Sequence, residues 1–248
     1  MIDDPFFYAV AVPAVLLMGL SKSGFGAGFG ALAVPLMALA VPVPQAAAIM
    51  LPLLAVMDAF GLAALWRERD RALIRLLLPA GLAGTVLGTV LFGWLSSTTV
   101  AGLVGGLTLA FLAIRRFFPP RRDAPPPPRW LGWLLGLTSG FTSFVAHAGG
   151  PPIGFYVLPL KLSPLRFTAT MSVFFAAINA SKWLPYAWLG LIDTRNMLAS
   201  AALMPLAPVG VWLGVRAVRV IPQRLFYRLF ELGMLLTGTK LLWDGVMR

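Results

Sequence analysis

Long apolar runs separated by short polar loops dominate the chain. Six of these runs are mostly uncharged and approach the ~20 residues that a helix needs to cross a hydrocarbon core of ~30 Å. They cover Gln45 to Leu65, Ala72 to Leu95, Thr98 to Ile114, Leu165 to Ala187, Asn196 to Val215 and Leu225 to Val246. The alternation over ~10 residues that is typical of a transmembrane β-strand is not found in the sequence. The pattern therefore predicts an all-α polytopic membrane protein.

Two further apolar segments are interrupted by glycine. The stretch "GLSKSGFGAGFG" (19–30) separates Phe6 to Leu20 from Ala31 to Val41. As helices these pieces would be ~22 Å and ~16 Å long, so the second is too short to span. Trp130 to Val145 and Ile153 to Leu162 form a similar pair around "AHAGGPP". Each pair is therefore predicted to be a re-entrant helical hairpin that turns near the membrane midplane.

The two halves of the chain resemble diverged copies of each other. Gly30 and Pro44 align with Gly150 and Pro164, and the Pro79, Gly84 and Gly88 spacing recurs as Pro205, Gly210 and Gly214. Internal repeats with broken helices are a sequence mark of secondary transporters. The predicted first repeat covers 1–118, with a hairpin at 6–41 and spans at about 45–65, 72–95 and 98–117. A Pro/Arg-rich linker covers 119–129, and the second repeat covers 130–248, with a hairpin at 130–162 and spans at about 164–188, 196–216 and 225–247.

The loop charges predict the orientation of the chain. If both broken segments are hairpins, one face receives fifteen of the twenty basic residues. They are Arg67, Arg69, Arg71, Arg75, Arg115, Arg116, Arg121, Arg122, Arg129, Lys161, Arg166, Arg216, Arg219, Arg224 and Arg228. The basic face is expected to be cytoplasmic. We therefore expect a bacterial inner-membrane protein with both termini in the periplasm and two inverted repeats, each a hairpin plus three transmembrane helices.

Composition narrows the function further. Only 12% of the 248 residues are charged, whereas a soluble domain carries about a quarter. The net charge of +11 is explained by loop arginines, so no nucleic-acid partner is expected. The chain has no cysteine, which excludes thiolate metal sites and cysteine nucleophiles. The first residues, "MIDDPFFYAV", lack the basic segment of a cleaved signal peptide.

The glycine-rich tips are candidates for an anion site. Half-helices that begin near Gly30 and Gly150 would direct free N–H groups and positive dipole ends at the centre. The candidate substrate-binding residues are Ser21, Lys22, Ser23, Gly28, Phe29, Gly30, His147, Gly149, Gly150, Asn179 and Lys182, and the candidate coupling or proton-carrying residues are Asp58 and His147. Charged residues inside membrane segments are functional by default. No cofactor and no metal is expected, since one histidine with few nearby acids does not supply a metal site.

The glycine breaks resemble those of the sulfite exporter TauE/SafE family, also called the 4-toluene sulfonate uptake permease family. The resemblance rests on Gly19–Gly30 with Pro35 and on Gly136–Pro152 with Tyr156. It implies passage of sulfite, thiosulfate, sulfonates or other small organic anions. Lys22 and His147 depart from the family's pattern, whose tips are richer in glycine and poorer in charge.

Each candidate also has a structural interpretation. Lys22 or Lys182 could pair with Asp58 instead of contacting substrate, and Lys182 could extend toward the outer interface. His147 could be a neutral packing residue, and the serines could bond to their own backbone. Pro52, Pro185, Pro205 and Pro208 are expected to kink spans. Small-residue spacings such as Gly84 to Gly88 fit packing within the chain as well as a homo-oligomer.

The leading hypothesis is a secondary transporter, not an enzyme, that moves small anions by alternating access. A coupling proton or ion and membrane lipid are its expected partners. A metal-cation transporter is the first alternative, although two intramembrane lysines oppose it. A third hypothesis is an intramembrane hydrolase in which Lys22 activates Ser21 or Ser23. Adjacent helical residues diverge by ~100°, which disfavours such a dyad.

Overall fold

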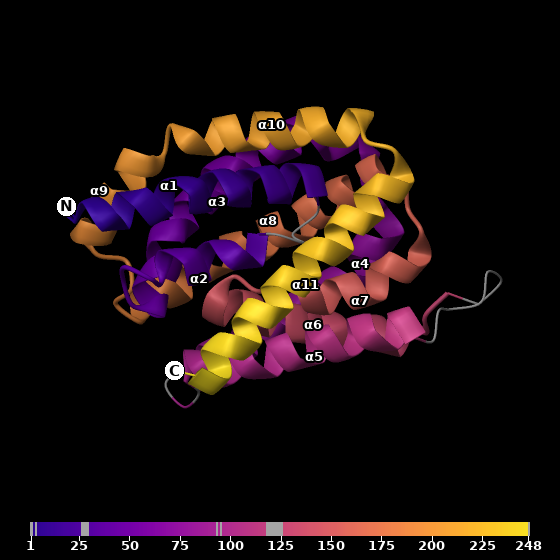
Figure 1. Cartoon of the computed structure of the whole chain (residues 1–248), viewed down its shortest axis with the longest axis horizontal. Coiled ribbons are helices and arrows are strands. Elements are labelled where there is room, and N and C mark those ends of the chain that lie inside the picture. Colours follow the sequence, from indigo (N-terminus) through magenta and orange to yellow (C-terminus); the bar gives the residue numbers. More distant parts are fainter. Residues whose placement is uncertain are drawn as a thin grey trace.

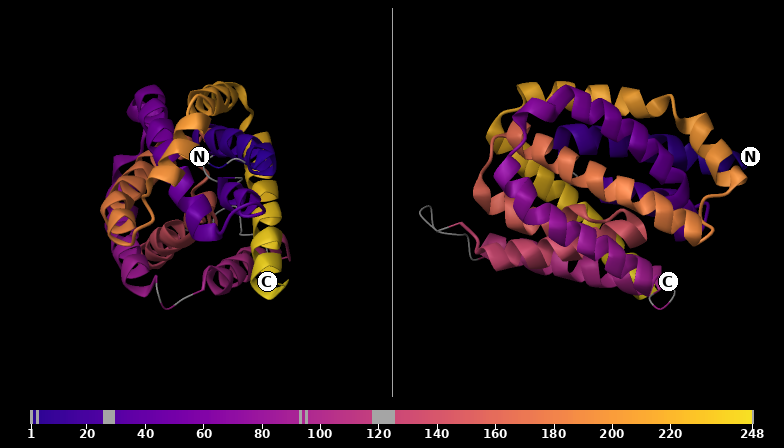
Figure 2. Two further views of the ribbon diagram at one scale, coloured as in Figure 1. Left: turned by 90° about the vertical axis from the view of Figure 1, so that its left-hand side faces the viewer. Right: turned by 180° about the vertical axis from the view of Figure 1, so that it is seen from behind.

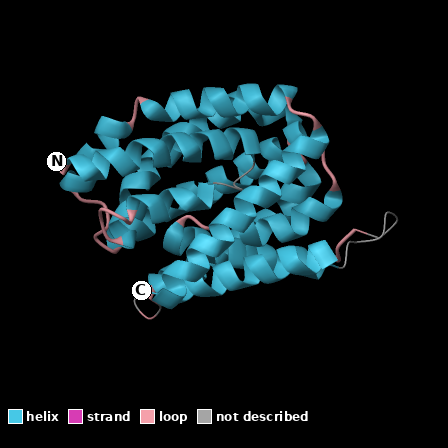
Figure 3. Ribbon diagram, in the orientation of Figure 1, coloured by secondary structure: helices cyan, strands magenta, loops and turns pink. Residues whose placement is uncertain are grey.

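The protein is a bundle of helices (Figure 3). The computed structural model describes residue 2 and residues 4–25, 30–92, 94, 96–117 and 126–247, and these contain no β-strand. The first half consists of α1 (Pro5–Leu20), η1 (Ser21–Phe25), η2 (Gly30–Leu32), α2 (Ala33–Met37), α3 (Val43–Leu65), η3 (Trp66–Glu68), α4 (Arg71–Leu91) and α5 (Ser97–Phe117). The second half consists of α6 (Arg129–Ala146), α7 (Gly150–Val157), η4 (Leu158–Leu160), α8 (Pro164–Trp188), α9 (Thr194–Leu203), α10 (Leu206–Val220) and α11 (Gln223–Met247). The prediction of an all-α fold is confirmed.

Local capping residues fix where several helices begin. The Asp70 carboxylate accepts hydrogen bonds from the backbone N–H groups of Ala72 and Leu73, 3.0 Å each, and so starts α4. Asp193 accepts from Asn196 N–H at 2.8 Å and starts α9. These side chains satisfy N–H groups that have no partner within the helix. Both caps lie in short polar loops, as the sequence pattern requires.

Several helices have the length and composition of membrane spans. Among the described residues, Pro5–Gly24, Val43–Glu68 and Arg71–Leu91 are long and apolar enough to cross a membrane. The pair formed by α9 and α10 passes the same test if it counts as one bent span. The chain is therefore a membrane-integral protein by the character of its helices.

The segment predicted as a single span at 196–216 consists of two helices. The axes of α9 and α10 differ by 49°. Pro205 caps α10 at this break, where proline removes a backbone donor and disfavours helical backbone before it. The kink expected at Pro205 is thus present, whereas α3 and α8 continue through Pro52 and Pro185.

The helix ends divide between two opposite ends of the bundle. In Figure 1 the first turn of α1 and the last turn of α11 lie at the left. The junctions from α7 to α8 and from α10 to α11 lie at the right, and the reverse view in Figure 2 agrees. Basic residues predicted for one face, such as Lys161, Arg166 and Arg224, belong to these right-hand junctions.

The two halves pack through reciprocal helix pairs. The pairs are α3 with α8, α5 with α11, α4 with α6, and α1 with α10. Glycines allow the last three to approach closely. A Cβ added to Gly84 would lie 2.0 Å from the Leu137 carbonyl oxygen of α6, and one on Gly214 would lie 2.6 Å from the Leu20 carbonyl oxygen of α1. In each half, a glycine-containing helix packs against the broken segment of the other half: α4 packs against α6, and α10 packs against α1.

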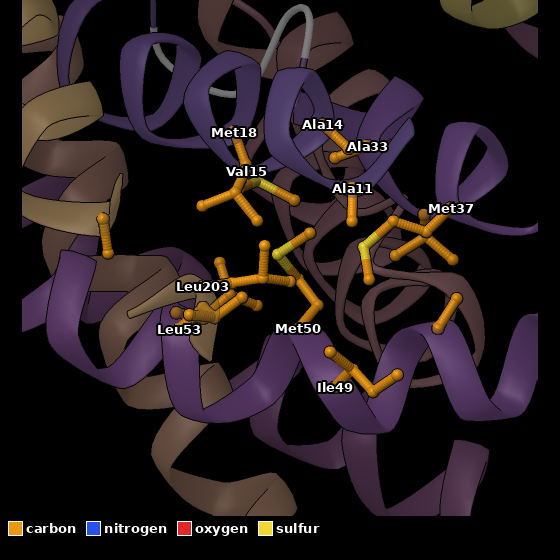
Figure 4. Packing of buried hydrophobic residues seen from close by; sticks show 14 of the residues in the cluster. Ala11, Ala14, Val15, Met18, Ala33, Met37, Ile49, Met50, Leu53 and Leu203 are labelled. Atoms are coloured by element: carbon orange, nitrogen blue, oxygen red, sulfur yellow. The ribbon is translucent and has the colours of Figure 1, made fainter. Parts of the chain in front are cut away.

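Apolar clusters fill the space between these pairs. The cluster in Figure 4 joins α1, α2, α3, α9 and α10, with Val15, Met37, Met50 and Leu203 among its buried members. A second cluster around Phe167, Phe174 and Phe230 joins α4, α7, α8 and α11. A third, smaller cluster lies around Phe144 and Tyr186. Together they enclose a buried polar centre.

Candidate functional site

The polar centre lies where η1 and the α6–α7 junction meet α3 and α8. Lys22 comes from η1, Asp58 from α3, His147 from the α6–α7 junction, and Asn179 and Lys182 from α8. Lys182 is fully buried, and the other four residues are at most 8% exposed. Five polar residues from four segments thus share one site away from water.

Lys22 and Asp58 form a buried ion pair. The Lys22 ammonium lies 2.7 Å from Asp58 Oδ1. Asn179 Nδ2 donates to the other carboxylate oxygen at 2.9 Å. Of the two interpretations of Lys22, the structure contains the pairing with Asp58. Such a pair is stable only when both oxygens are satisfied, and Asn179 meets this requirement.

Lys182 continues the network from Asn179 to His147. Its ammonium donates to Asn179 Oδ1 at 3.1 Å, and to Ser143 Oγ at 2.8 Å and the Ser143 carbonyl at 2.7 Å. It also lies 2.8 Å from His147 Nδ1. Lys182 therefore points into the protein and does not extend toward the outer interface.

His147 connects α6 to the start of α7. Its backbone adopts φ 51° and ψ 27°, the left-handed conformation that ends a helix. Nε2 lies 3.1 Å from the Ala47 carbonyl oxygen, which can only accept. A protonated Lys182 donates to Nδ1, so this geometry suits a neutral ring whose single proton is on Nε2.

The charges of this centre do not balance. Lys22 is neutralised by Asp58. The partners that the structure gives Lys182 are uncharged: the hydroxyl and the carbonyl of Ser143, the side-chain oxygen of Asn179 and the ring of His147. A buried ammonium without a carboxylate is costly in a low-dielectric interior. With Lys182 protonated and His147 neutral, the centre would carry one positive charge in excess among the described residues.

A small cavity adjoins the network. It measures about 30 Å³, more than the ~10–15 Å³ that one water molecule requires. Lys22, Gly30, Ser143, His147, Gly150 and Asn179 line it together with Met18, Ala31, Leu54 and Phe175. Lys182 is not part of this lining and acts from behind Ser143, His147 and Asn179. Polar and apolar residues thus line the cavity together, and it has space for a small ion.

The two half-helix starts contribute differently to the cavity. The Gly30 N–H is occupied, because it donates to Ser21 Oγ at 2.8 Å. At the second start, Pro151 and Pro152 have no N–H, so Gly150 is the residue of this first turn that brings an N–H to the cavity wall. Of the two N–H groups expected at the half-helix starts, that of Gly30 is therefore not free, and that of Gly150 remains a candidate donor.

Ser23 and Gly149 lie near the site but outside the cavity lining. Ser23 is fully buried and its hydroxyl has no hydrogen-bond partner among the described residues. Gly149 accepts a hydrogen bond from Ser139 Oγ at 2.7 Å through its carbonyl, which closes the second break. Gly28 and Phe29 lie outside the described residues.

Some cavity residues were not predicted from the sequence. Ser143 lies one helical turn before His147 on α6, and Phe175 lies one turn before Asn179 on α8. Side chains four residues apart share a helix face, and this spacing could have identified both. Ala47 takes part through its carbonyl, for which the side-chain sequence gives no signal.

The geometry gives less support to a metal site or to a serine–lysine hydrolase. No three His, Cys, Asp or Glu side chains of the described part of the chain are grouped so that they could hold a metal ion. The Lys22 ammonium points to Asp58, and Ser21 Oγ accepts from Gly30. The arrangement that a serine–lysine hydrolase requires is thus not the one formed by these groups.

Comparison with known proteins gives one result for the whole chain. A family model described as sulfite exporter TauE/SafE matches residues 11–241. No curated protein and no solved structure matches the chain.

Proposed function

The chain belongs to the sulfite exporter TauE/SafE family of membrane transporters, and from this membership we propose that it is a secondary transporter of small sulfur-containing oxyanions. Sulfite and thiosulfate are the preferred candidates, ahead of bulkier sulfonates. The observation that carries the proposal is Lys182, a fully buried lysine with uncharged partners beside a cavity. An anion in that cavity would balance its charge.

The cavity supports the choice of a small anion. Lys22 and Asn179 can donate from one side, and Gly150 N–H from another. Its small volume of about 30 Å³ favours a small anion over one with an aromatic or long alkyl group. The same cationic surplus opposes the metal-cation alternative, because a metal ion would add charge of the wrong sign.

The inverted-repeat architecture is part of this proposal. The first repeat would cover 1–118 and the second 130–248, joined by the linker 119–129. The helix pairs support it, because α4 with α6 and α1 with α10 are exchanged by the repeat relationship, while α3 with α8 and α5 with α11 are their own counterparts. In this arrangement α1 with α2 and α6 with α7 are re-entrant hairpins that enter from opposite faces of the inner membrane, and both termini are periplasmic.

Alternating access would expose the central cavity first to one face and then to the other. The third apolar cluster, around Phe144 and Tyr186, lies beyond His147 on the side of the termini and would close that exit. Asp58 and His147 are the proposed sites of a coupling proton, because both can change charge within contact of the lysines. A change in either would alter the affinity for the anion.

Binding and transport can be measured separately. Purified protein is expected to gain thermal stability with thiosulfate or sulfite but not with chloride, because a ligand stabilises the folded state that binds it. Proteoliposomes are expected to accumulate radiolabelled thiosulfate, and Lys182→Met is expected to abolish both responses. Ser181→Ala, one residue away and bonded to its own helix backbone, is the matched control. Wild-type protein that neither binds nor moves these anions would refute the proposal.

A further inference from the structure

A second cavity lies at the basic end of the bundle. It has a volume of about 650 Å³ and is lined by the last turns of α3 and by η3, together with Leu165 of α8 and Arg219 of α10. Arg67 and Arg219 are its cationic residues, and Glu68 is its acidic one. Arg219 Nη2 donates to the Ala64 carbonyl at 3.3 Å, which holds the guanidinium over the cavity wall. We call this space the basic vestibule.

The vestibule and the central cavity are both bordered by α3 and α8. On α3, Asp58 belongs to the central network, and Leu62, one turn later, lines the vestibule. On α8, Leu165 lines the vestibule and Phe175 lines the central cavity. Asp58 and Leu62, four residues apart, lie on one face of α3. The vestibule and the central cavity thus lie at successive levels along both helices.

A short buried segment separates the two cavities. Gly61 of α3 faces Ser23, since a Cβ there would lie 3.4 Å from Ser23 Oγ. On α8, Thr168 Oγ1 donates to the Gly24 carbonyl of η1 at 3.4 Å, and Ser172 lies one turn further along the same face. We call Ser23, Gly24, Thr168 and Ser172 the neck.

The neck has polar groups without partners. The hydroxyls of Ser23 and Ser172 are buried, 0% and 2% exposed, and neither has a hydrogen-bond partner among the described residues. A serine within a helix normally bonds back to the carbonyl of the preceding turn, as Thr170 of the same helix does to Arg166 at 2.7 Å. Buried polar groups without partners are rare and require an explanation.

We propose that the basic vestibule and the neck form the path by which an oxyanion passes between the central cavity and the basic face. The inference rests on the proposed function and extends it with a second binding region. Arg67 and Arg219 attract the anion into the vestibule. The Ser23 and Ser172 hydroxyls then donate to its oxygens in the neck, which is closed in this conformation. The π-helical turn η1 forms one side of the neck and is the element that moves to open it, because π-helical turns are strained and concentrate at functional sites.

Single cysteines can test this path without any background. The chain has no native cysteine, so Ser23→Cys and Ser172→Cys each introduce a unique thiol. Two membrane-impermeant methanethiosulfonates are used as probes, one with a sulfonate head and one with a trimethylammonium head. Val173→Cys, at the same depth but on the adjacent face of α8, is the matched control. Arg75→Cys, exposed at the basic end, reports which membrane preparation presents that face to the reagent.

The expected result is selective labelling by charge and by side. Ser172→Cys should react from the face that labels Arg75→Cys, and the anionic reagent should react about tenfold faster than the cationic one, because a cleft with one sign of charge concentrates the opposite ion. Val173→Cys should react slowly with both. Replacing Arg67 and Arg219 by glutamine should remove the preference, and Glu68→Gln should increase it.

Three results would overturn the path. They are equal rates for the two reagents at Ser172→Cys, labelling only from the opposite face, and failure to label either neck cysteine in protein that still transports. Each cysteine variant is first checked for thiosulfate-induced thermal stabilisation, which reports the central site. Absence of thiosulfate-induced stabilisation in the wild-type protein would refute the proposed function. Unselective labelling in variants that thiosulfate still stabilises would refute only the path.

Discussion

The two helix breaks at the centre of the bundle differ in backbone conformation and in the charge that they carry or contact. The first passes from α1 through the π-helical η1 and carries Lys22, whose charge is neutralised by Asp58. The second turns in one left-handed residue, His147, which contacts Lys182, a cation with uncharged partners. The lysine visible in the glycine-rich stretch is therefore not the source of the surplus charge. That surplus comes from α8, behind the second break.

The largest difference is expected when each lysine is removed. Lys22→Met leaves Asp58 as a buried carboxylate without its cation, which typically costs about 3–5 kcal/mol of stability. Lys182→Met leaves uncharged acceptors, so we expect a loss of about 1–3 kcal/mol. Thermal unfolding in one detergent compares the two. The double variant Lys22→Met with Asp58→Asn should recover most of the loss, and a double variant as unstable as Lys22→Met would contradict this account.

The glycine contacts beside the two breaks should differ next. A Cβ at Gly140 of α6 would lie 1.9 Å from the Gly81 carbonyl oxygen, whereas one at Gly210 would lie 3.1 Å from its nearest atoms on α1. Backbone atoms cannot rotate away, so Gly140→Ala should cost about 3 kcal/mol and Gly210→Ala about 1 kcal/mol.

Gly106→Ala is the control for both, because its nearest atom would be 3.9 Å away. In that helix interior alanine should add up to about 1 kcal/mol. Equal losses of stability for Gly140→Ala and Gly210→Ala, measured by thermal unfolding, would show that the contact of α6 with α4 and that of α10 with α1 are equally tight.

The hydroxyls that close the breaks should have smaller effects. Ser21→Ala leaves the Gly30 N–H without its acceptor, and we expect a loss of about 1–2 kcal/mol. Ser139→Ala removes a donor to the Gly149 carbonyl, and we expect about 1 kcal/mol or less, since buried carbonyls tolerate a missing partner better than N–H groups. Hydrogen exchange at Gly30 should rise in the first variant only. Unchanged exchange there would mean that Ser21 does not cap η2.

The smallest change is expected at the left-handed residue. His147→Asn keeps a side chain that tolerates this conformation and an oxygen that can accept from Lys182, so stability should fall by less than about 1 kcal/mol. His147→Ala should lose about 1 kcal/mol more, because alanine is strained there and offers no acceptor. Equal stability of the two variants would contradict the role given to the backbone. Thiosulfate-induced stabilisation of His147→Asn separates packing from binding.

Much of the helix arrangement could be predicted, because the length of an apolar run and the charge of a loop are local properties of the sequence. The bend between α9 and α10 was signalled by Pro205 but was not expected to divide a span. Asn179 and Lys182 could be grouped because they are one turn apart. Their relation to Asp58 could not be foreseen, since 121 residues separate Asp58 from Asn179 and only packing brings them together. The role of the Ala47 carbonyl has no sequence signal at all.

The exchanged glycine contacts also constrain how the chain is made. α1 begins at Pro5, yet the helix that supports it through Gly210 and Gly214 begins only at Leu206. During translation the first helix therefore waits in the bilayer without its partner until most of the chain has been synthesised. The second broken segment meets α4, which has already been inserted, as soon as it emerges. The order of the helices in the chain thus makes the helix partner of the second break available earlier than that of the first.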